Sequence, residues 1–200
     1  KVKGRDKVLR DLANNAGLRN TPFLPTEEEF SSKVGRKWAK NPLMITAYGA
    51  SLNAVIRAIS NAAYEQFLTQ LAETNKYTEN LADMTEEQQA AAYGQQMEAM
   101  LNLINQAFSY ADTAVQAHIN TGYQAQQFEG FNAEPMTMAG LSQIMQDKYG
   151  GDPRKMAREF TLANYKFNSV KVYNRDTDTS YTIREKTYED LFKTAVSATY

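Results

Sequence analysis

The sequence of 200 residues contains no cysteine and only one histidine, His118. Without cysteine the chain has no disulfide framework and no cysteine-ligated metal site, and this composition fits a reducing compartment. His118 has no second histidine and no carboxylate at metal-ligand spacing, so we interpret it as a structural residue. The chain also lacks the Gly-x-Ser-x-Gly sequence of many serine hydrolases, which leaves histidine-assisted nucleophilic chemistry without support.

Long apolar runs are absent as well. None approaches the roughly 20 residues that a membrane-spanning helix needs, and the basic start of the chain lacks the apolar core of a signal peptide. The hydrophobic content of 42% is enough for one sizeable core or two small ones, and the 22% of charged residues is ordinary for a globular protein. We therefore expect a globular, cytoplasmic protein with no membrane partner.

Positive charge is concentrated at the start of the chain. Residues 1–50 contain ten Lys or Arg and five Asp or Glu, a net charge of +5, whereas residues 51–150 contain three basic and eleven acidic residues, a net charge of −8. Residues 151–200 carry nine basic and seven acidic residues, a net charge of +2, which brings the whole chain to −1. The basic first quarter indicates a surface for a polyanion, although uneven solvated charge is also common in proteins without one.

Hydrophobic periodicity predicts a mainly α-helical fold with one small β-hairpin near the C-terminus. We expect residues 1–121 to form a helical core and residues 122–200 a helical segment with the hairpin, both within the same structural unit. Helices are expected over residues 5–16, from a capping box at Thr26 and Glu29 through Trp38, over residues 52–73, 85–120, 137–149 and 152–165, and from residue 188 onward. Residues 74–84 and 122–135 are expected to be loops, and residues 167–185 alternate between apolar and polar in the manner of a hairpin.

Two features of these helices allow more than one interpretation. Methionines on the helix of residues 85–120, including Met97 and Met100, favour core packing, but such a stripe is also found in recognition grooves. Arg154, Lys155 and Arg158 form a basic cluster that fits either a contact with a phosphate backbone or a solvated helix face.

One stretch near the start carries an unusual pattern of side chains. Arg36, Lys40, Met44 and Tyr48 recur every four residues, and Gly49 follows the last of them. On an α-helix this spacing forms one slowly drifting stripe about 18 Å long, from a rise of roughly 1.5 Å per residue. Two cations at one end suit phosphate oxygens, and a phenol beside a glycine at the other end suits a base or a sugar. The stripe therefore predicts binding of a nucleoside triphosphate.

Pro42 lies within this stretch and leaves its helical geometry open. In a continuous helix Pro42 removes the hydrogen bond to the carbonyl of Trp38, at a cost of about 3 kcal/mol. Alternatively, Asn41 is an N-cap and Pro42 is the first residue of a new helix, which would place Arg36 and Lys40 on a preceding turn or helix end.

The pattern Arg-x3-Lys-x3-Met-x3-Tyr-Gly resembles motif B of the single-subunit DNA-directed RNA polymerases of bacteriophages and mitochondria. The resemblance implies a polymerase fingers-type helical domain, in which this helix contacts the incoming nucleotide. By the family's pattern, Arg36 and Lys40 bind the triphosphate, and Tyr48 helps to select ribose over deoxyribose and supports the template base. Met44 and Gly49 then shape the nucleotide pocket. Lys40 and Tyr48 are accordingly the candidate catalytic residues.

The resemblance covers residues 36–49 and implies that the chain is the fingers portion of a larger polymerase or one piece of a divided phage enzyme. Such polymerases need two aspartates that hold Mg2+, from motifs on either side of motif B, and neither aspartate motif occurs here. We assign no metal ligand in this chain and expect Mg2+ to be bound mainly by residues outside it. The implied partners are template DNA, NTPs, nascent RNA and the remaining polymerase segment or a second polymerase subunit, in the host cytoplasm or the virion.

By chain order, the hairpin of residues 167–185 resembles the element with which these polymerases read promoter DNA. Lys171, Tyr173, Arg175 and Arg184 are the candidate nucleic-acid-binding residues, and a hairpin that only packs is the alternative.

Two other functions fit the same stripe. The fingers of family A DNA polymerases share the spacing, but they usually carry an aromatic residue at the position of Met44. A non-enzymatic helical protein that binds nucleic acid, or a virion structural protein, would use Arg36 and Lys40 only to contact phosphates.

Overall fold

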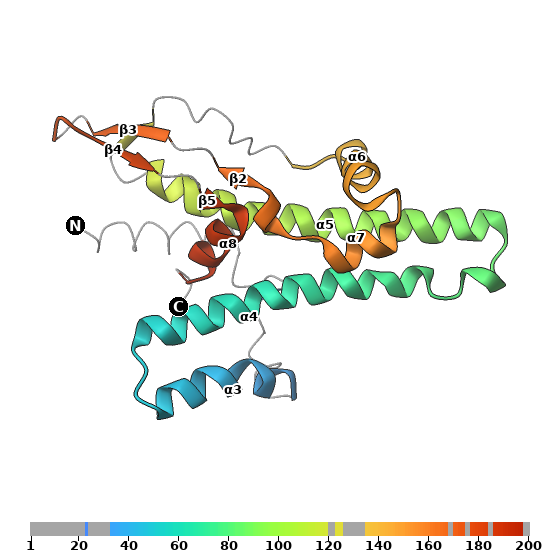
Figure 1. The fold of residues 1–200 in the computed structure, drawn as a ribbon, viewed down its shortest axis with the longest axis horizontal. Coiled ribbons are helices and arrows are strands. Elements are labelled where there is room, and N and C mark those ends of the chain that lie inside the picture. The colour runs from blue at the N-terminus through green and yellow to red at the C-terminus, as the bar shows by residue number, and fades with distance from the viewer. Residues whose placement is uncertain are drawn as a thin grey trace. The chain divides into compact units, whose positions relative to one another are not determined.

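The computed structural model describes Phe23 and residues 33–119, 123–125, 135–167, 170–174, 177–183 and 186–197. Its architecture is mainly helical, as the sequence predicts (Figure 1). The expected helix at residues 5–16 and the capping box of Thr26 and Glu29 lie outside the described residues. Within the ranges given above, no helix combines the length and the hydropathy needed to cross a membrane.

The helices follow the expected order along the chain. They are α3 (Lys33–Ala47), α4 (Leu52–Glu73), α5 (Glu86–Ile119), α6 (Met138–Tyr149), α7 (Pro153–Glu159) and α8 (Tyr188–Ser197). Short 3₁₀ helices also occur, η2 (Thr74–Thr78), η3 (Leu81–Asp83) and η4 (Leu162–Asn164). The segment between α4 and α5, expected to be a loop, therefore contains two short 3₁₀ helices, η2 and η3.

Side-chain caps explain where several helices begin. Before α5 the amide of Gln88 donates to Thr85 Oγ1 at 3.2 Å, and the amide of Thr85 donates to Gln88 Oε1 at 3.0 Å. This reciprocal pair is the expected capping box, which satisfies amides left free at a helix start. The hydroxyl of Thr137 caps α6 and the carboxylate of Asp152 caps α7, also as expected.

α7 is shorter than the sequence predicts. The helix expected to reach about Tyr165 ends at Glu159, because Phe160 adopts an extended backbone with ψ of 137°. The Phe160 ring packs edge-on against Phe67, with 6.3 Å between the ring centroids, and Phe160 is 3% exposed. Burial of this aromatic ring favours the turn over a longer helix.

α3 passes through Pro42 without a break. The chain therefore follows the first of the two alternatives, and the prediction of a new helix capped by Asn41 is wrong. Pro42 has no amide hydrogen to donate to the carbonyl of Trp38. One turn later, Thr46 Oγ1 donates to the carbonyl oxygen of Pro42 at 2.7 Å.

The expected hairpin is present near the C-terminus. β3 (Val170–Asn174) and β4 (Thr179–Ile183) pair antiparallel, with Lys171 opposite Thr182. β1 (Tyr123–Ala125) pairs with the other edge of β3, which gives the strand order β1-β3-β4. The sequence assigns this segment to a loop, and that prediction is wrong at β1, because three residues are too few for a readable alternation.

A second ladder joins β2 (Lys166–Phe167) to β5 (Lys186–Thr187), again antiparallel. The amide of Tyr188 extends this connection by donating to the carbonyl of Tyr165 at 2.9 Å. The ladder thereby fixes the start of α8.

The described residues separate into two compact units. The first unit draws its residues from 1–65, 109–133 and 162–200, and the second unit draws them from 66–108 and 134–161. α4 and α5 each contribute residues to both units. The division expected at residue 121 stays a prediction.

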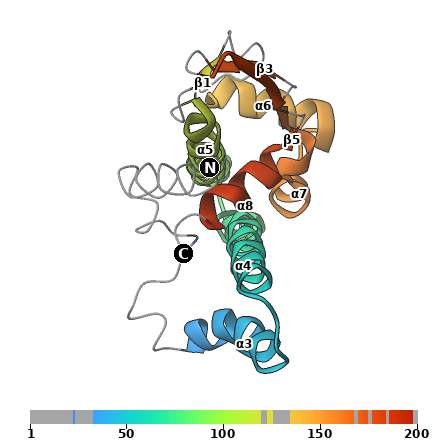
Figure 2. The ribbon, with the colours of Figure 1, turned by 90° about the vertical axis from the view of Figure 1, so that its left-hand side faces the viewer.

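An aromatic cluster forms the core of the first unit. Phe23, Tyr110 and Phe192 are 0% exposed, and their ring centroids are separated by 5.0 to 5.8 Å. Tyr64 packs edge-on against Phe192 at 5.7 Å, and its hydroxyl accepts a hydrogen bond from the amide of Leu162 at 3.0 Å. These contacts hold α8 against the parts of α4 and α5 that belong to this unit (Figure 2).

A buried polar network organises the second unit. Gln96 is 0% exposed, and its Nε2 donates to Asn75 Oδ1 at 2.7 Å while its Oε1 accepts from Thr78 Oγ1 at 2.8 Å. Arg154 Nη1 donates to the carbonyl oxygen of Thr78 at 2.7 Å and to Thr78 Oγ1 at 3.0 Å. Arg154 therefore holds α7 to the turn after α4.

Two open interpretations are resolved in this unit. Met97 and Met100 are 8% and 0% exposed, which confirms that they pack in the core. Lys155 and Arg158 are exposed, whereas Arg154 is half-buried in the network. The basic cluster of α7 is therefore not one continuous phosphate-binding face.

Candidate functional site

The four-residue stripe runs along α3 to Tyr48, which directly follows the helix and whose amide donates to the carbonyl of Met44 at 3.2 Å, and the described side chains of the stripe face solvent. Lys40 is exposed, Met44 is 47% exposed and Tyr48 is 83% exposed. Between Lys40 and Tyr48 the helix advances about 12 Å and turns by about 80° beyond two full turns. Across the described portion of the chain, the Lys40 ammonium and the Tyr48 hydroxyl have no hydrogen-bond or ion-pair partner. Lys40 on α3 and Tyr48 at its end are thus both open to a ligand.

Gly49 ends the helix that carries the stripe. Its amide donates to the carbonyl of Thr46 at 3.0 Å, and the amide of Ala50 donates to the carbonyl of Ile45 at 2.9 Å. This pair of bonds is a Schellman motif, which requires a left-handed residue at its centre, and Gly49 has a φ of +79°. No atom lies within 4 Å of the place where a Cβ would be. The left-handed backbone conformation therefore explains the glycine at this position, whereas crowding by neighbouring atoms of the chain does not.

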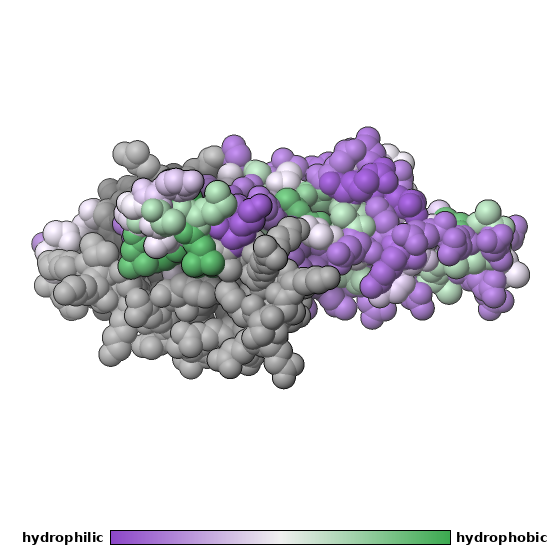
Figure 3. Space-filling view, turned by 90° about the horizontal axis from the view of Figure 1, so that it is seen from below, coloured by the Kyte–Doolittle hydropathy of each residue, from purple (hydrophilic) through white to green (hydrophobic). Residues whose placement is uncertain are grey.

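Large apolar side chains are exposed around the stripe. Leu43 is 66% exposed and Leu52 is 73% exposed, and they join Met44 and Tyr48 at the end of α3 and the start of α4. Figure 3 looks onto this side of the molecule and shows green apolar surface beside purple hydrophilic surface over α3. Exposed apolar surface of this kind is typical of interaction sites. We call these four residues the α3 patch.

The other predicted site residues are only partly described. Arg36 lies on α3, but its side chain falls outside the described part of the structure. Lys171 and Tyr173 lie on β3, but their side chains are also outside the described part of the structure. Arg175 and Arg184 lie outside the described residues altogether. The structure therefore brings together Lys40, Met44, Tyr48 and Gly49. The assignment of hairpin residues to DNA stays a prediction.

A magnesium ion has no set of ligands near the stripe. α3 contains no aspartate or glutamate, and the described residues include no group of three or more His, Asp or Glu that could hold a metal ion. These residues do not fit a magnesium site, so no chemical step in this chain is assigned to a metal.

A groove in the first unit was not anticipated from the sequence. It has a volume of about 610 Å³ and lies between the N-terminal half of α4 and the polar face of α8. Asn53, Arg57 and Asn61 line one wall at four-residue spacing. This four-residue repeat of polar side chains on α4 is a sequence signal for one wall of the groove, but it does not show what lies opposite that wall.

Comparison with known protein families identifies a match over most of the chain. Residues 6–196, nearly the whole chain, match the family model described as bacteriophage N4 RNA polymerase, helical domain. Neither the curated proteins nor the solved structures contain a match. The matched range includes α3 and the lining residues of the groove except Ser197.

Proposed function

Because this chain belongs to the bacteriophage N4 RNA polymerase helical-domain family, we propose that it is the nucleotide-binding fingers portion of a DNA-dependent RNA polymerase. In this proposal α3 holds the triphosphate of the incoming NTP and inspects its sugar during template-directed RNA synthesis. One observation carries the proposal. Lys40 and Met44 are exposed on one continuous helix and Tyr48 is exposed directly after its last residue, in the order expected for motif B.

The exposure of these side chains argues against a purely structural role. A tyrosine that serves the core is buried, as Tyr64 is in the first unit at 6% exposure, whereas Tyr48 is 83% exposed. Exposure of Met44 and Leu43 beside Tyr48 also costs free energy in water unless a partner covers them. A bound nucleotide and the template base next to it provide such a cover.

The chemistry of the stripe divides along its length. The Lys40 ammonium supplies a compact charge for phosphate oxygens, and the Arg36 guanidinium supplies a planar fork for the same triphosphate. The Tyr48 hydroxyl and ring meet the sugar and the template base, about 12 Å further along the helix. Gly49 keeps the backbone bare where the base approaches. Met44 forms the apolar floor between the two ends.

The remaining parts of the active site come from elsewhere in this proposal. When bound, Mg2+ neutralises charge on the reacting phosphates, and its aspartate ligands belong to the rest of the polymerase or to a second subunit. Template DNA and nascent RNA are the macromolecular partners. Lys171 and Tyr173 on β3, with Arg175 and Arg184, are the candidate contacts to DNA.

Steady-state kinetics of the assembled polymerase test the role of Lys40. Lys40→Gln removes the charge but keeps a long polar side chain, so KM for NTP should rise about 10- to 100-fold, as for loss of one hydrogen bond to a charged group. Lys76→Gln is the matched control, because Lys76 is also an exposed lysine but lies in η2 of the second unit. An unchanged KM for Lys40→Gln would remove the phosphate-binding role.

A further inference from the structure

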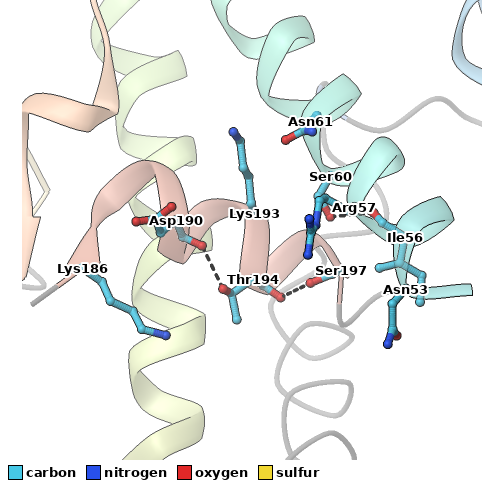
Figure 4. Close-up of a pocket in the computed structure, with 10 residues that line it drawn as sticks. All are labelled: Asn53, Ile56, Arg57, Ser60, Asn61, Lys186, Asp190, Lys193, Thr194 and Ser197. Atoms are coloured by element: carbon cyan, nitrogen blue, oxygen red, sulfur yellow. Dashed lines mark hydrogen bonds between the residues drawn. The ribbon is translucent and has the colours of Figure 1, made fainter. Parts of the chain in front are cut away.

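The groove between α4 and α8 is built from polar residues on two facing helix walls. Figure 4 shows its lining residues, with the Arg57 side chain directed from α4 toward α8. Thr194 and Ser197 lie on the opposite wall, and Lys186 of β5 lies at one end. None of these residues belongs to the stripe on α3.

The polar character of each wall follows from helix geometry. On α8 the apolar residues Leu191, Phe192, Ala195 and Val196 are buried, while the groove residues Asp190, Lys193, Thr194 and Ser197 occupy the opposite face. On α4 the face that buries Ala63 and Tyr64 continues toward the helix start, where it carries Ser60, Arg57 and Asn53 instead of apolar side chains. The groove therefore lies where the core-facing stripe of α4 becomes polar.

Charge in the groove is positive and only partly compensated. Lys193 Nζ is 2.7 Å from Glu189 Oε1 and 5.1 Å from the centre of the Tyr64 ring, so this lysine is held in place. Asp190 Oδ2 accepts from Thr187 Oγ1 at 3.0 Å in the cap of α8. Among the described residues, Arg57 and Lys186 have no hydrogen-bond or ion-pair partner. The Arg57 guanidinium and the Lys186 ammonium are therefore available to bind an anion.

We infer that this groove binds the phosphodiester backbone of a single nucleic-acid strand. Its volume of about 610 Å³ exceeds what one phosphate fills, so an extended ligand with more than one charge fits better. Arg57 and Lys186 suit phosphate oxygens, and the side-chain amides of Asn53 and Asn61 offer donors and acceptors to sugar and base edges. This site goes beyond the nucleotide-binding role of α3, and it does not depend on that role.

Salt-dependent binding of short oligonucleotides tests the inference directly. The full protein is titrated with labelled dT and rU oligonucleotides of about 12 nucleotides, at about 50 and 200 mM salt, with fluorescence anisotropy as readout. The double variant Arg57→Gln and Lys186→Gln should lose about two phosphate contacts. The drop in affinity between the two salt concentrations should then become about sevenfold smaller than for the unchanged protein.

A gain-of-charge variant tests the same groove in the opposite direction. Ser197→Lys adds a cation at the end of α8, where a helix terminus favours positive charge, and it should tighten strand binding and steepen its salt dependence. Comparison of dT with rU tells whether the bound strand is DNA or RNA. Inorganic triphosphate, titrated as a competitor, tells whether isolated phosphate groups are bound equally well.

The controls separate this site from the stripe on α3 and from a folding defect. Lys76→Gln, in the second unit, should leave strand binding unchanged, and circular dichroism should show equal helix content for all variants. Lys40→Gln should raise KM for NTP in the assembled polymerase. In the oligonucleotide titration, the double variant should lose the same affinity whether or not Lys40 is also replaced. The inference would be overturned if the double variant bound the oligonucleotides with unchanged affinity and unchanged salt dependence. It would also be overturned if the double variant lost binding of inorganic triphosphate but kept its affinity for the oligonucleotides.

Discussion

Thr46 Oγ1 donates a hydrogen bond to the carbonyl oxygen of Pro42 at 2.7 Å, inside a helix that runs unbroken from Lys33 to Ala47. The proline removes one backbone bond upstream, and the threonine adds a side-chain bond one turn downstream. Because the helix continues, Lys40 and Tyr48 keep a helical separation. The helical path from Lys40 to Met44 therefore continues through Pro42.

The first prediction concerns Pro42 itself. Pro42→Ala restores an amide donor for the carbonyl of Trp38 and should stabilise α3 locally by about 1 to 3 kcal/mol. Hydrogen exchange should therefore slow at the amides of residues 43–47. Pro153→Ala is the matched control, because Pro153 occupies the first turn of α7, where proline is tolerated. Faster exchange in α3 after Pro42→Ala would contradict a continuous helix.

A second prediction separates conformation from space at Gly49. Gly49→Ala places a Cβ at a φ of +79° with no atom nearby to clash, so it should destabilise the end of α3 by about 1 kcal/mol through backbone strain. Gly49→Asn should cost less, since asparagine tolerates the left-handed region better than alanine. Hydrogen exchange of the Ala50 amide reports both effects. Equal protection in the two variants would exclude the Schellman motif as the reason for the glycine.

A third prediction addresses the polar network of the second unit. Arg154→Ala leaves the carbonyl of Thr78 without its guanidinium donor, and the free energy of unfolding should fall by about 2 kcal/mol. Lys155→Ala, its exposed neighbour on α7, should change the free energy by less than about 0.5 kcal/mol. Urea denaturation measures both. Equal effects would show that Arg154 belongs to a solvated face.

A fourth prediction follows from the pKa of Tyr188. Burial and the nearby charge of Asp112 raise the pKa of its phenol above the ordinary value. The folded protein holds this proton more tightly than the unfolded chain, so the resulting stability is present below about pH 10 and is lost as pH rises through the raised pKa. Above about pH 10, the unfolding temperature of Tyr188→Phe should fall less steeply with rising pH than that of the unchanged protein. An unchanged slope would exclude this linkage.

Sequence patterns predicted most of the helical fold because local signals were explicit. The capping box of Thr85 and Gln88, the cap at Thr137, and the Asp152-Pro153 start all form as expected. Tertiary contacts decided the exceptions. Phe160 leaves the helix to pack on Phe67, and β1 forms by pairing with β3, a partner far along the chain.

The candidate site was predictable only in part. Four-residue spacing placed Lys40, Met44 and Tyr48 on one helix, but it gave no sign that Leu43 and Leu52 would extend the α3 patch. Nor did spacing show that α8 would face Arg57 across a groove, since that contact depends on packing of Tyr64 against Phe192. The spacing of residues in the sequence predicts which side chains share one face of a helix, whereas tertiary packing determines which element lies opposite that face.

Sugar selection by the assembled polymerase tests the central claim most directly. The ratio of kcat/KM for an rNTP to that for the matching dNTP is compared between the unchanged enzyme and Tyr48→Phe, with Tyr93→Phe on α5 as the control tyrosine. The account predicts an enzyme that prefers rNTP, a fall of about tenfold or more in this ratio for Tyr48→Phe, and little change in KM for rNTP. An unchanged ratio in Tyr48→Phe, or an unchanged enzyme that prefers dNTP, would contradict it.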